Sequence, residues 1–502
     1  MNNVNSNKLR DGIRSVLLNI PSKALEGHKE LVNQIEELIE DNKDLSSIIE
    51  ESDCDKKAFS ISIEKLFKKV SSCINDREYE GSQSYFKSLE KKFKSLNDSE
   101  EEIIDSFIDD YMNEILDGKA TFCKISILDG IDIYKPLAED INFDIKLTGE
   151  KTEILLRALP LWFNDITKLS LKDIKGIYDG SIHNSYHATQ LRLWERLEWN
   201  YKLVLITKEE IDLSSFNTEY SIICKKDITG ASIRPYAKLF DVTKLYTNEA
   251  KLLAILRLFK IGDVKVIRSH LFKIVKGSDK DILVPLISTN DYDKEPMHKY
   301  TLRNEDDVRL LQEFWKQLSN SEPFKPYETS FEKYYLELAY EDYTDAMLQK
   351  NYIKSLVYSI MGIDSLFGLD EQGIRENIKN RISKLFNILN SLYSYKYSNY
   401  GYMVYSAYGV RNKYVHGDIK YIEKLEEFKQ NYKLEDLLEC LRISLIIIIL
   451  IDMNDLSKIP SQKQDFKKRF VDIMDNASEA DLKNMLDEKL KDIKECLKPS
   501  TQ

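Results

Sequence analysis

An arginine, a carboxamide and a histidine lie close together in residues 408–418, which read YGVRNKYVHGD. Arginine carries a permanent planar charge that suits phosphate oxygens, and histidine, with an unperturbed pKa of about 6.5, exchanges protons near neutral pH. On a helix, Asn412 and His416 share a face, and Arg411 lies about 100° to one side, within reach of the same small volume. We therefore predict that Arg411, Asn412 and His416 converge on one phosphodiester.

A second interpretation assigns these residues to the end of a helix. His416 would then interact with the last backbone carbonyls, and Gly417, in a left-handed conformation, would end the helix. A helix end needs only Gly417 and one cation, so this interpretation gives no role to Arg411 and Asn412 one turn earlier. Both interpretations predict that a helix stops at Gly417.

The spacing Arg-x4-His, with a polar residue directly after the arginine, resembles the signature of the HEPN superfamily of helical-bundle ribonucleases. The segments 355–368, 374–386 and 470–475 look like successive helices of the ApeA-like branch of that superfamily, found in bacterial abortive-infection and anti-phage proteins. Family members often carry Glu where this chain has Asp364. The resemblance covers about residues 330–500 and implies a C-terminal HEPN helical bundle.

RNA carries its own nucleophile, the 2′-OH, so its cleavage needs a base, a positive charge beside the phosphorane and an acid for the leaving oxygen. We predict that His416 acts as base or acid, that Arg411 neutralises the phosphorane, and that Asn412 orients the phosphate or the imidazole, with no metal and no cofactor. One histidine does not easily serve both proton transfers. The resemblance implies a homodimer through the HEPN domain, with both copies of the motif lining one cleft. The expected products are a 2′,3′-cyclic phosphate and a 5′-hydroxyl.

Other side chains near the motif are candidates for supporting it. They are Asp364, Tyr408, Lys413 and Tyr414. Tyr402, Tyr405 and Tyr408 recur at helical spacing and are expected mostly to pack the bundle. Tyr408 and Tyr414 lie nearest to the motif and are the best candidates for stacking unpaired bases, as in an anticodon loop of tRNA.

The formal net charge of −11 repels RNA, so binding has to be local. One predicted helix carries a basic stripe that can supply it, although such charges also occur on merely solvated helix faces. The stripe consists of Arg375, Lys379, Arg381 and Lys384.

The sequence divides into three regions: a helical region at 1–118, a mixed α/β region at 119–320 and a helical region at 325–502, with a linker at 319–326. The predicted fold class is mostly α with an α/β middle region. Strands are predicted at 201–206, 220–224, 264–268 and 282–287, and Thr247 is predicted to cap a helix. Residues 95–118 contain nine acids and no base, which indicates a solvated helix face or one that masks a basic cleft or meets a basic partner.

Several classes of protein are disfavoured. Six scattered cysteines without a C-x-x-C pair argue against a structural zinc site and a disulfide framework. His183 and His187, with Asp179 nearby, could chelate a metal, but no third ligand is evident. The apolar run 441–451 contains Arg442 and is too short to cross a bilayer, so it is predicted to be a central buried helix or a dimer seam.

We expect a cytoplasmic protein whose partners are RNA, with tRNA as one candidate, and a second copy of itself. A phage-derived trigger or an inhibitory partner is expected on the N-terminal region, and no membrane partner. The alternative function, from another class, is a non-catalytic HEPN-type module for dimerisation or partner binding.

Overall fold

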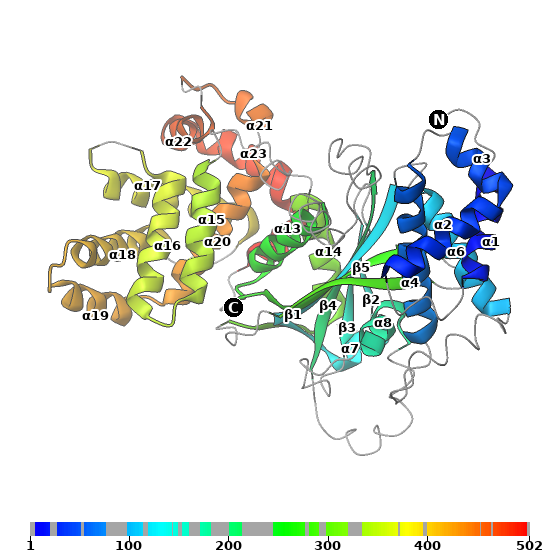
Figure 1. Cartoon of the computed structure of the whole chain (residues 1–502). Coiled ribbons are helices and arrows are strands. Elements are labelled where there is room, and N and C mark those ends of the chain that lie inside the picture. The colour runs from blue at the N-terminus through cyan, green and yellow to red at the C-terminus, as the bar shows by residue number, and fades with distance from the viewer. Residues whose placement is uncertain are drawn as a thin grey trace, which may run out of the picture. The chain divides into compact units, whose positions relative to one another are not determined.

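The structure is a computed structural model of the chain, and the statements below concern the residues that it describes. Those residues are 6–20, 28–51, 55–76, 98–113, 119–142, 144–148, 153–159, 171–181, 200–212, 244–276, 281–290, 298–319, 334–369, 372–394, 399–451, 453–462 and 465–498. The chain is mostly helical with a sheet in the middle of the sequence, as predicted (Figure 1). It forms two compact units, 1–124 with 208–246 and 270–289, and 125–207 with 247–269 and 290–502. The predicted middle region therefore contributes to both units.

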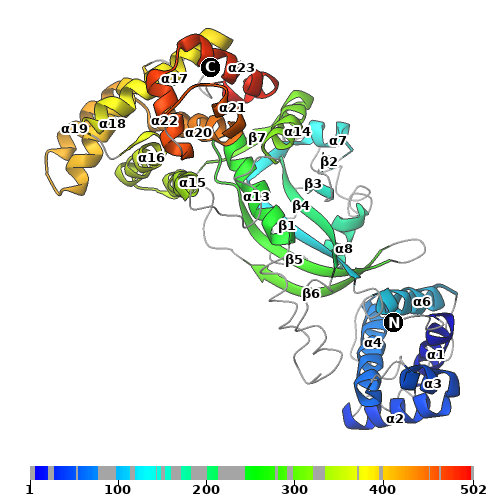
Figure 2. The same cartoon turned by 90° about the horizontal axis from the view of Figure 1, so that it is seen from above.

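Five helices gather around one core in the first unit (Figure 2). They are α1 (Ser6–Asn19), α2 (His28–Asp41), α3 (Lys43–Glu51), α4 (Lys56–Asp76) and α6 (Asp98–Met112). Each presents apolar residues at helical spacing to that core, among them Ile13, Ile35 and Phe67, which are at most 1% exposed. Val275 and Val284, from strands of the sheet, join the same core.

The acidic helix α6 meets basic side chains of its own unit. Arg14 of α1 lies 3.1 Å from Glu101 and 3.5 Å from Asp105. Lys273, almost fully buried, pairs with Asp110 at 2.5 Å. The carboxylates facing α1 stay partly exposed, with Glu101 50% and Asp109 55% exposed. This agrees with the predicted solvated face, and a basic partner or a masked basic cleft stays a prediction.

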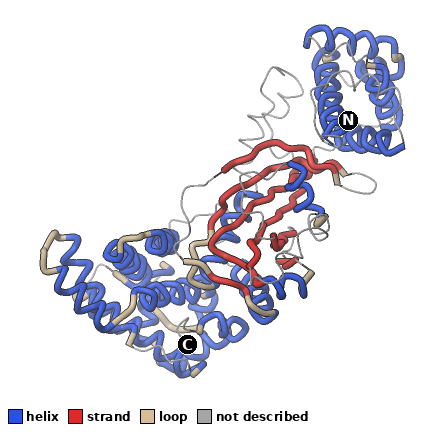
Figure 3. Tube along the Cα trace, turned by 90° about the horizontal axis from the view of Figure 1, so that it is seen from below, coloured by secondary structure: helices blue, strands red, loops and turns tan. Residues whose placement is uncertain are grey.

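The sheet, whose strands are red in Figure 3, has the strand order β2-β3-β4-β1-β5-β6, with β7 paired to β1 in parallel. Its strands and the helices beside them are β1 (Lys119–Tyr134), α7 (Lys135–Asp140), β2 (Asp144–Thr148), β3 (Glu153–Leu159), α8 (Leu171–Asp179), β4 (Asn200–Asp212), α13 (Lys244–Phe259), β5 (Lys265–Val275), β6 (Ile282–Asn290), β7 (Tyr300–Leu302) and α14 (Glu305–Ser319). Strands β2 and β3 pair antiparallel, with Ile145 opposite Leu156.

The strands predicted at 201–206, 264–268 and 282–287 are present in β4, β5 and β6. The strand predicted at 220–224 lies outside the described residues. The prediction that Thr247 caps a helix is wrong, because α13 begins at Lys244 and Thr247 lies inside its first turn. A threonine is tolerated inside a helix, so its presence alone does not fix where the helix starts.

The C-terminal helices of the second unit form a bundle. They are α15 (Tyr334–Leu348), α16 (Tyr352–Phe367), α17 (Ile374–Tyr393), α18 (Tyr400–Val415), α19 (Tyr421–Asn431), α20 (Leu434–Leu450), α21 (Met453–Ser457), α22 (Phe466–Asn476), α23 (Glu479–Leu490) and a 3-10 helix η7 (Lys491–Leu497). Helix α16 packs against α15, α18 and α20. A Cβ at Gly362 would lie 2.8 Å from Leu441 of α20 and 3.2 Å from the Ala339 carbonyl oxygen of α15, so glycine permits this close packing.

The apolar run at 441–451 forms most of α20, and its residues are almost entirely buried within one chain. The prediction of a central buried helix is confirmed, and this burial leaves little of the run to serve as a dimer seam. In the part of the chain that the structure describes, no helix combines the length and the apolar character needed to cross a membrane.

Arg442 is the largest fully buried side chain of the described residues. It pairs with Glu439 through two hydrogen bonds of 2.8 and 2.6 Å. It also donates to the carbonyl oxygens of Leu258 and Phe259 at the end of α13, and to that of Cys496 in η7. Burial lowers the pKa of Arg442, but Glu439 outweighs this effect and the pKa lies above its usual value. The guanidinium thus satisfies helix-end carbonyls that have no partner within their own helix.

Candidate functional site

The predicted motif occupies the last turn of α18, and the helix ends as the sequence indicates. His416 is the C-cap, and Gly417 has a left-handed φ of +70°. The Asp418 N–H donates to the Lys413 carbonyl oxygen at 2.9 Å, and the Gly417 N–H donates to the Tyr414 carbonyl oxygen at 3.1 Å. These two bonds make a Schellman motif, which satisfies carbonyls at the end of the helix. The turn therefore has a capped, defined geometry.

Arg411 and Asn412 are in direct contact within this turn. The Arg411 Nη1 donates to the Asn412 Oδ1 at 2.9 Å, and the guanidinium carbon lies 5.6 Å from the centre of the Tyr408 ring. The Arg411 Nε is buried and has no hydrogen-bond partner among the described residues. Arg411 is thus a partly buried cation that keeps an unused donor.

His416 lies on the surface, four residues after Asn412. Its side chain is exposed, and no described residue forms a hydrogen bond with its imidazole. As an i, i+4 pair, His416 and Asn412 lie on one face of α18. The exposed imidazole is therefore free to contact a substrate that also contacts Asn412.

Asp364 of α16 lies behind the motif. It accepts a long hydrogen bond of 3.4 Å from the Tyr408 hydroxyl. Burial raises the pKa of Asp364, and the positive charges of Arg411 and Lys467 oppose this rise without cancelling it. Burial also raises the pKa of Tyr408, and the neighbouring carboxylate raises it further. Asp364 and Tyr408 therefore form a polar pair that contributes negative charge near Arg411.

Lys467, at the start of α22, was missed by the sequence analysis. It is partly buried, burial lowers its pKa, and its charge acts on Asp364. Lys467 lies far from the motif in the sequence, between Phe466 and Lys468 in a run of basic residues, so no local pattern distinguishes it.

Two of the predicted supporting residues contribute to the shape of the turn. Lys413 pairs with Asp418 at 2.7 Å, and this contact lowers the pKa of Asp418. Tyr414 is half-buried and packs edge-on against Tyr421 of α19, with ring centres 5.2 Å apart. Tyr408 is only 5% exposed, which argues against its prediction as a base-stacking residue.

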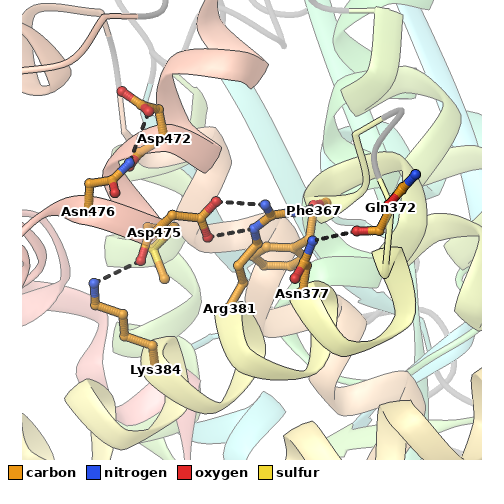
Figure 4. Close-up of polar contacts among 9 residues, drawn as sticks. Phe367, Gln372, Asn377, Arg381, Lys384, Asp472, Asp475 and Asn476 are labelled. Carbon is orange, nitrogen blue, oxygen red and sulfur yellow. Dashed lines mark hydrogen bonds and ion pairs between the residues drawn. The ribbon is translucent and has the colours of Figure 1, made fainter.

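The predicted basic stripe on α17 splits into two pairs. Arg381 is 2% exposed, forms a bidentate ion pair with Asp475 at 2.8 and 2.6 Å, and donates to the Phe367 carbonyl oxygen (Figure 4). Lys384 donates to the carbonyl oxygens of Met474 and Ala477, at the end of α22. These contacts hold α17 against α22 and argue against an RNA-binding role for both cations.

Arg375 and Lys379 remain at the surface of α17, beside α18. The Arg375 Nε donates to the Tyr405 carbonyl oxygen at 2.8 Å, and the Lys379 amine lies 5.0 Å from the centre of the Tyr402 ring. Tyr402 is 58% exposed, although its spacing had predicted a packing role. The Lys379 side chain is 15% exposed and also pairs with Glu376 on its own helix. Both cations therefore lie next to tyrosines of the helix that carries the motif.

The alternative metal site cannot be placed. His183 and His187 lie outside the described residues, and Asp179 accepts a hydrogen bond from the Ser181 backbone N–H at 2.8 Å. Among the described residues, no three His, Cys, Asp or Glu side chains gather as a metal-binding group. Comparisons of the chain with protein-family models, with curated proteins and with solved structures found no match.

Proposed function

We propose that the chain is a metal-independent endoribonuclease of the HEPN type, which acts as a toxin or abortive-infection effector in anti-phage defence. The observation that carries this proposal is the capped last turn of α18. There Arg411, a partly buried cation, is held against Asn412, and His416 follows with an exposed imidazole. A permanent cation and a titratable group beside one another are what cleavage of a phosphodiester by the 2′-OH requires.

The proposed reaction needs two proton transfers. The His416 imidazole of one protomer accepts the proton of the 2′-OH while the 2′-oxygen attacks phosphorus. The guanidinium of Arg411 balances the negative charge of the phosphorane. The bond from phosphorus to the 5′-oxygen then breaks, and a protonated His416 of the second protomer gives its proton to that oxygen. A 2′,3′-cyclic phosphate and a 5′-hydroxyl result, and the amide nitrogen of Asn412 is available to donate to the phosphate.

Exposed apolar side chains beside the motif support a homodimer. Val415 is 54% exposed, Ile419 76% and Ile422 48%, and all three lie between the end of α18 and the first turn of α19. A second copy that covers them would bring the two motifs together, as the reaction requires. The same patch favours the alternative, a non-catalytic module for dimerisation or partner binding, so dimerisation alone does not separate the two functions.

The N-terminal two thirds, residues 1–320 with the mixed α/β region at 119–320 as a sensor or regulatory domain, are proposed to receive the signal that controls cleavage, either a phage-derived trigger or an inhibitory partner. The helices of the first unit lie in this region. Its helices contain none of the predicted site residues. The substrate is proposed to be RNA with unpaired bases, such as a tRNA loop.

The decisive experiment compares full-length variants. Purified His416→Ala and Arg411→Ala should each cleave RNA at least about 100-fold more slowly than the parent, while remaining folded and of the same oligomeric state. Arg309→Ala is the matched control, because Arg309 is a 72% exposed arginine whose ion pair, with Asp306 three residues away on α14, is itself at the surface. Cleavage by the parent should persist in excess EDTA, and induced expression should arrest growth with the parent and not with His416→Ala.

Equal cleavage by His416→Ala and the parent would contradict the catalytic assignment. A parent that dimerises but neither cleaves RNA nor arrests growth would favour the non-catalytic alternative.

A further inference from the structure

Tyr402 is an exposed aromatic side chain near the start of α18. Its exposed fraction is 58%, and among the large apolar side chains that the structure describes as exposed only that of Ile419 is higher. The Lys379 amine lies 5.0 Å from the centre of its ring. Lys379 also pairs with Glu376 on its own helix. The exposed ring of Tyr402 is a surface on which an unpaired base can stack.

A second cation, Arg375 of α17, lies against Tyr405, the next residue on the same face of α18. The Arg375 guanidinium carbon lies 3.6 Å from the centre of the Tyr405 ring, and its Nε donates to the Tyr405 carbonyl oxygen. Among the described residues, none accepts a hydrogen bond from the Nη1 or Nη2 of Arg375. The guanidinium is thus fixed by one nitrogen and its ring contact, and its other two nitrogens can donate to an anion.

Gly409 continues this face and makes room for the guanidinium. A Cβ at Gly409 would lie 2.8 Å from the Arg375 Nη2, so the arginine rests against α18 where a side chain is missing. Beyond Gly409 the same face carries Asn412 and His416.

These residues follow one another at steps of three and four, which places them in one stripe along the helix. The stripe consists of Tyr402, Tyr405, Gly409, Asn412 and His416, and we call it the α18 strip. At about 1.5 Å per residue it is about 21 Å long. At about 3.4 Å per stacked nucleotide this length corresponds to about six nucleotides.

We propose that the α18 strip binds single-stranded RNA that continues from the scissile phosphate, with a base stacked on Tyr402 and a phosphate bound by Arg375. The proposal rests on the proposed function and adds a substrate-binding site to it. The overall negative charge of the chain requires local binding of this kind, and Arg375 supplies a cation whose Nη1 and Nη2 have no hydrogen-bond partner among the described residues. Lys379 lies beside it and is paired with Glu376.

The test measures binding of two fluorescently labelled uridine oligonucleotides, of four and twelve nucleotides, to the full-length chain. A stacked base contributes about 1–3 kcal/mol, so Tyr402→Ala should weaken binding of the twelve-nucleotide RNA by about 5- to 150-fold. Binding of the four-nucleotide RNA, which is too short to span from His416 to Tyr402, should change much less. Tyr402→Phe is the matched control and should bind like the parent, because it keeps the ring.

Two further measurements test the separate roles given to Tyr402 and Arg375. A twelve-base-pair RNA duplex should be insensitive to Tyr402→Ala, because its bases are not free to stack. Arg375→Gln should reduce the salt dependence of binding by about one counterion, whereas Tyr402→Ala should leave it unchanged.

The outcomes separate this proposal from the proposed function. If His416→Ala abolishes cleavage but Tyr402→Ala binds the longer RNA like the parent, the RNA-binding role of the α18 strip is wrong and the proposed nuclease activity is supported. If Tyr402→Ala selectively weakens binding of the longer RNA but the parent does not cleave that RNA, the RNA-binding role of the α18 strip is supported and the proposed nuclease activity is wrong. Equal weakening of both RNAs, or no binding of RNA by the parent, would overturn the strip.

Discussion

The buried ion pair of Glu439 and Arg442 should be one of the most sensitive points of the second unit. Glu439→Gln keeps the shape of the side chain but leaves a fully buried guanidinium without a counter-charge. Breaking a buried pair in this way costs about 3–5 kcal/mol. At about 2 °C per kcal/mol for a unit of this size, the melting temperature should fall by about 6–10 °C.

A double-mutant cycle tests whether the pair itself is responsible. Arg442→Met leaves the Glu439 carboxylate buried and unpaired, and should also cost about 3–5 kcal/mol. The cycle is completed by Glu439→Leu, which leaves the guanidinium unpaired as Glu439→Gln does and should cost about 3–5 kcal/mol. The variant with both Glu439→Leu and Arg442→Met buries no charge, and it loses the hydrogen bonds to three backbone carbonyls, at about 1 kcal/mol each. The double variant should therefore be more stable than the sum of the two single changes predicts, by at least about 2 kcal/mol.

The assay is thermal and denaturant unfolding of the full-length variants, with hydrogen exchange of α13 and η7 as a local measure. Glu427→Gln is the matched control, because Glu427 pairs with Lys424 at the same spacing but both side chains are about half exposed. That control should cost less than about 0.5 kcal/mol. If Glu439→Gln proves as mild as Glu427→Gln, or if the cycle is additive, the role given to this pair is wrong.

Three further predictions concern single residues. The pKa of Asp364 is higher in the folded chain than in the unfolded chain. Asp364 therefore contributes stability at a pH below its unfolded-state pKa, and this contribution is lost as the pH rises through its folded-state pKa. Asp364→Asn should therefore melt above the parent at pH 8, with a difference that shrinks toward pH 4, although it should cleave RNA more slowly. Burial and neighbouring carboxylates raise the pKa of Asp342 to about 6. After allowance for solvent screening, Asp342→Asn should therefore increase the free energy of unfolding by about 1 kcal/mol above pH 6 and leave it unchanged below pH 4. Denaturant titrations at both pH values measure this difference. Gly417 and Gly373 have left-handed φ values of +70° and +73°, and a Cβ added at either would meet no atom within 4 Å. Gly417→Ala and its control Gly373→Ala should therefore each cost about 1 kcal/mol of stability, but only Gly417→Ala should slow cleavage. Equal cleavage rates for the two variants would contradict a role for the capped turn.

The end of α18 could be predicted from the sequence because its determinants are local. A glycine after a run of helix-forming residues, with a cation in the last turn, specifies the same end whatever packs against it, and Gly417 ends the helix as expected. The strands β4, β5 and β6 were predictable for the same reason, since their β-branched and aromatic residues are contiguous.

Of the tyrosines on α18 that were expected to pack the bundle, Tyr408 is buried as predicted and Tyr402 is exposed. Each step of three residues turns a helix by about 300°, so a series of such steps drifts by about 60° per step. Tyr402 lies at the solvent side, and two steps later Tyr408 has turned into the core, where it is 5% exposed. Spacing thus identifies neighbours on a helix, but the direction of the core depends on the elements that pack against it.

The roles of Arg381 and Lys467 could not be predicted because their partners are distant in the sequence. Arg381 pairs with Asp475, 94 residues away, and Lys467 acts on Asp364 from another helix. A basic stripe on a predicted helix looks the same whether its cations face solvent or hold a neighbouring helix. Only the packing of α17 against α22 separates Arg381 from Arg375.

The same distant contacts determine what the smallest stable unit containing the motif can be. A boundary at residue 325 follows the change in sequence composition, but it separates Arg442 from the carbonyl oxygens of Leu258 and Phe259. The core of the bundle is also continuous with that of α13, α14 and the sheet, through Phe259, Phe314 and the residues around them. A fragment of residues 325–502 would expose this apolar surface and leave donors of a buried guanidinium unpaired, so loss of activity in that fragment would report on folding. Control by the N-terminal helices is therefore better examined through point changes in the full chain, where Arg14 and Lys273 already pair with Glu101 and Asp110 of α6.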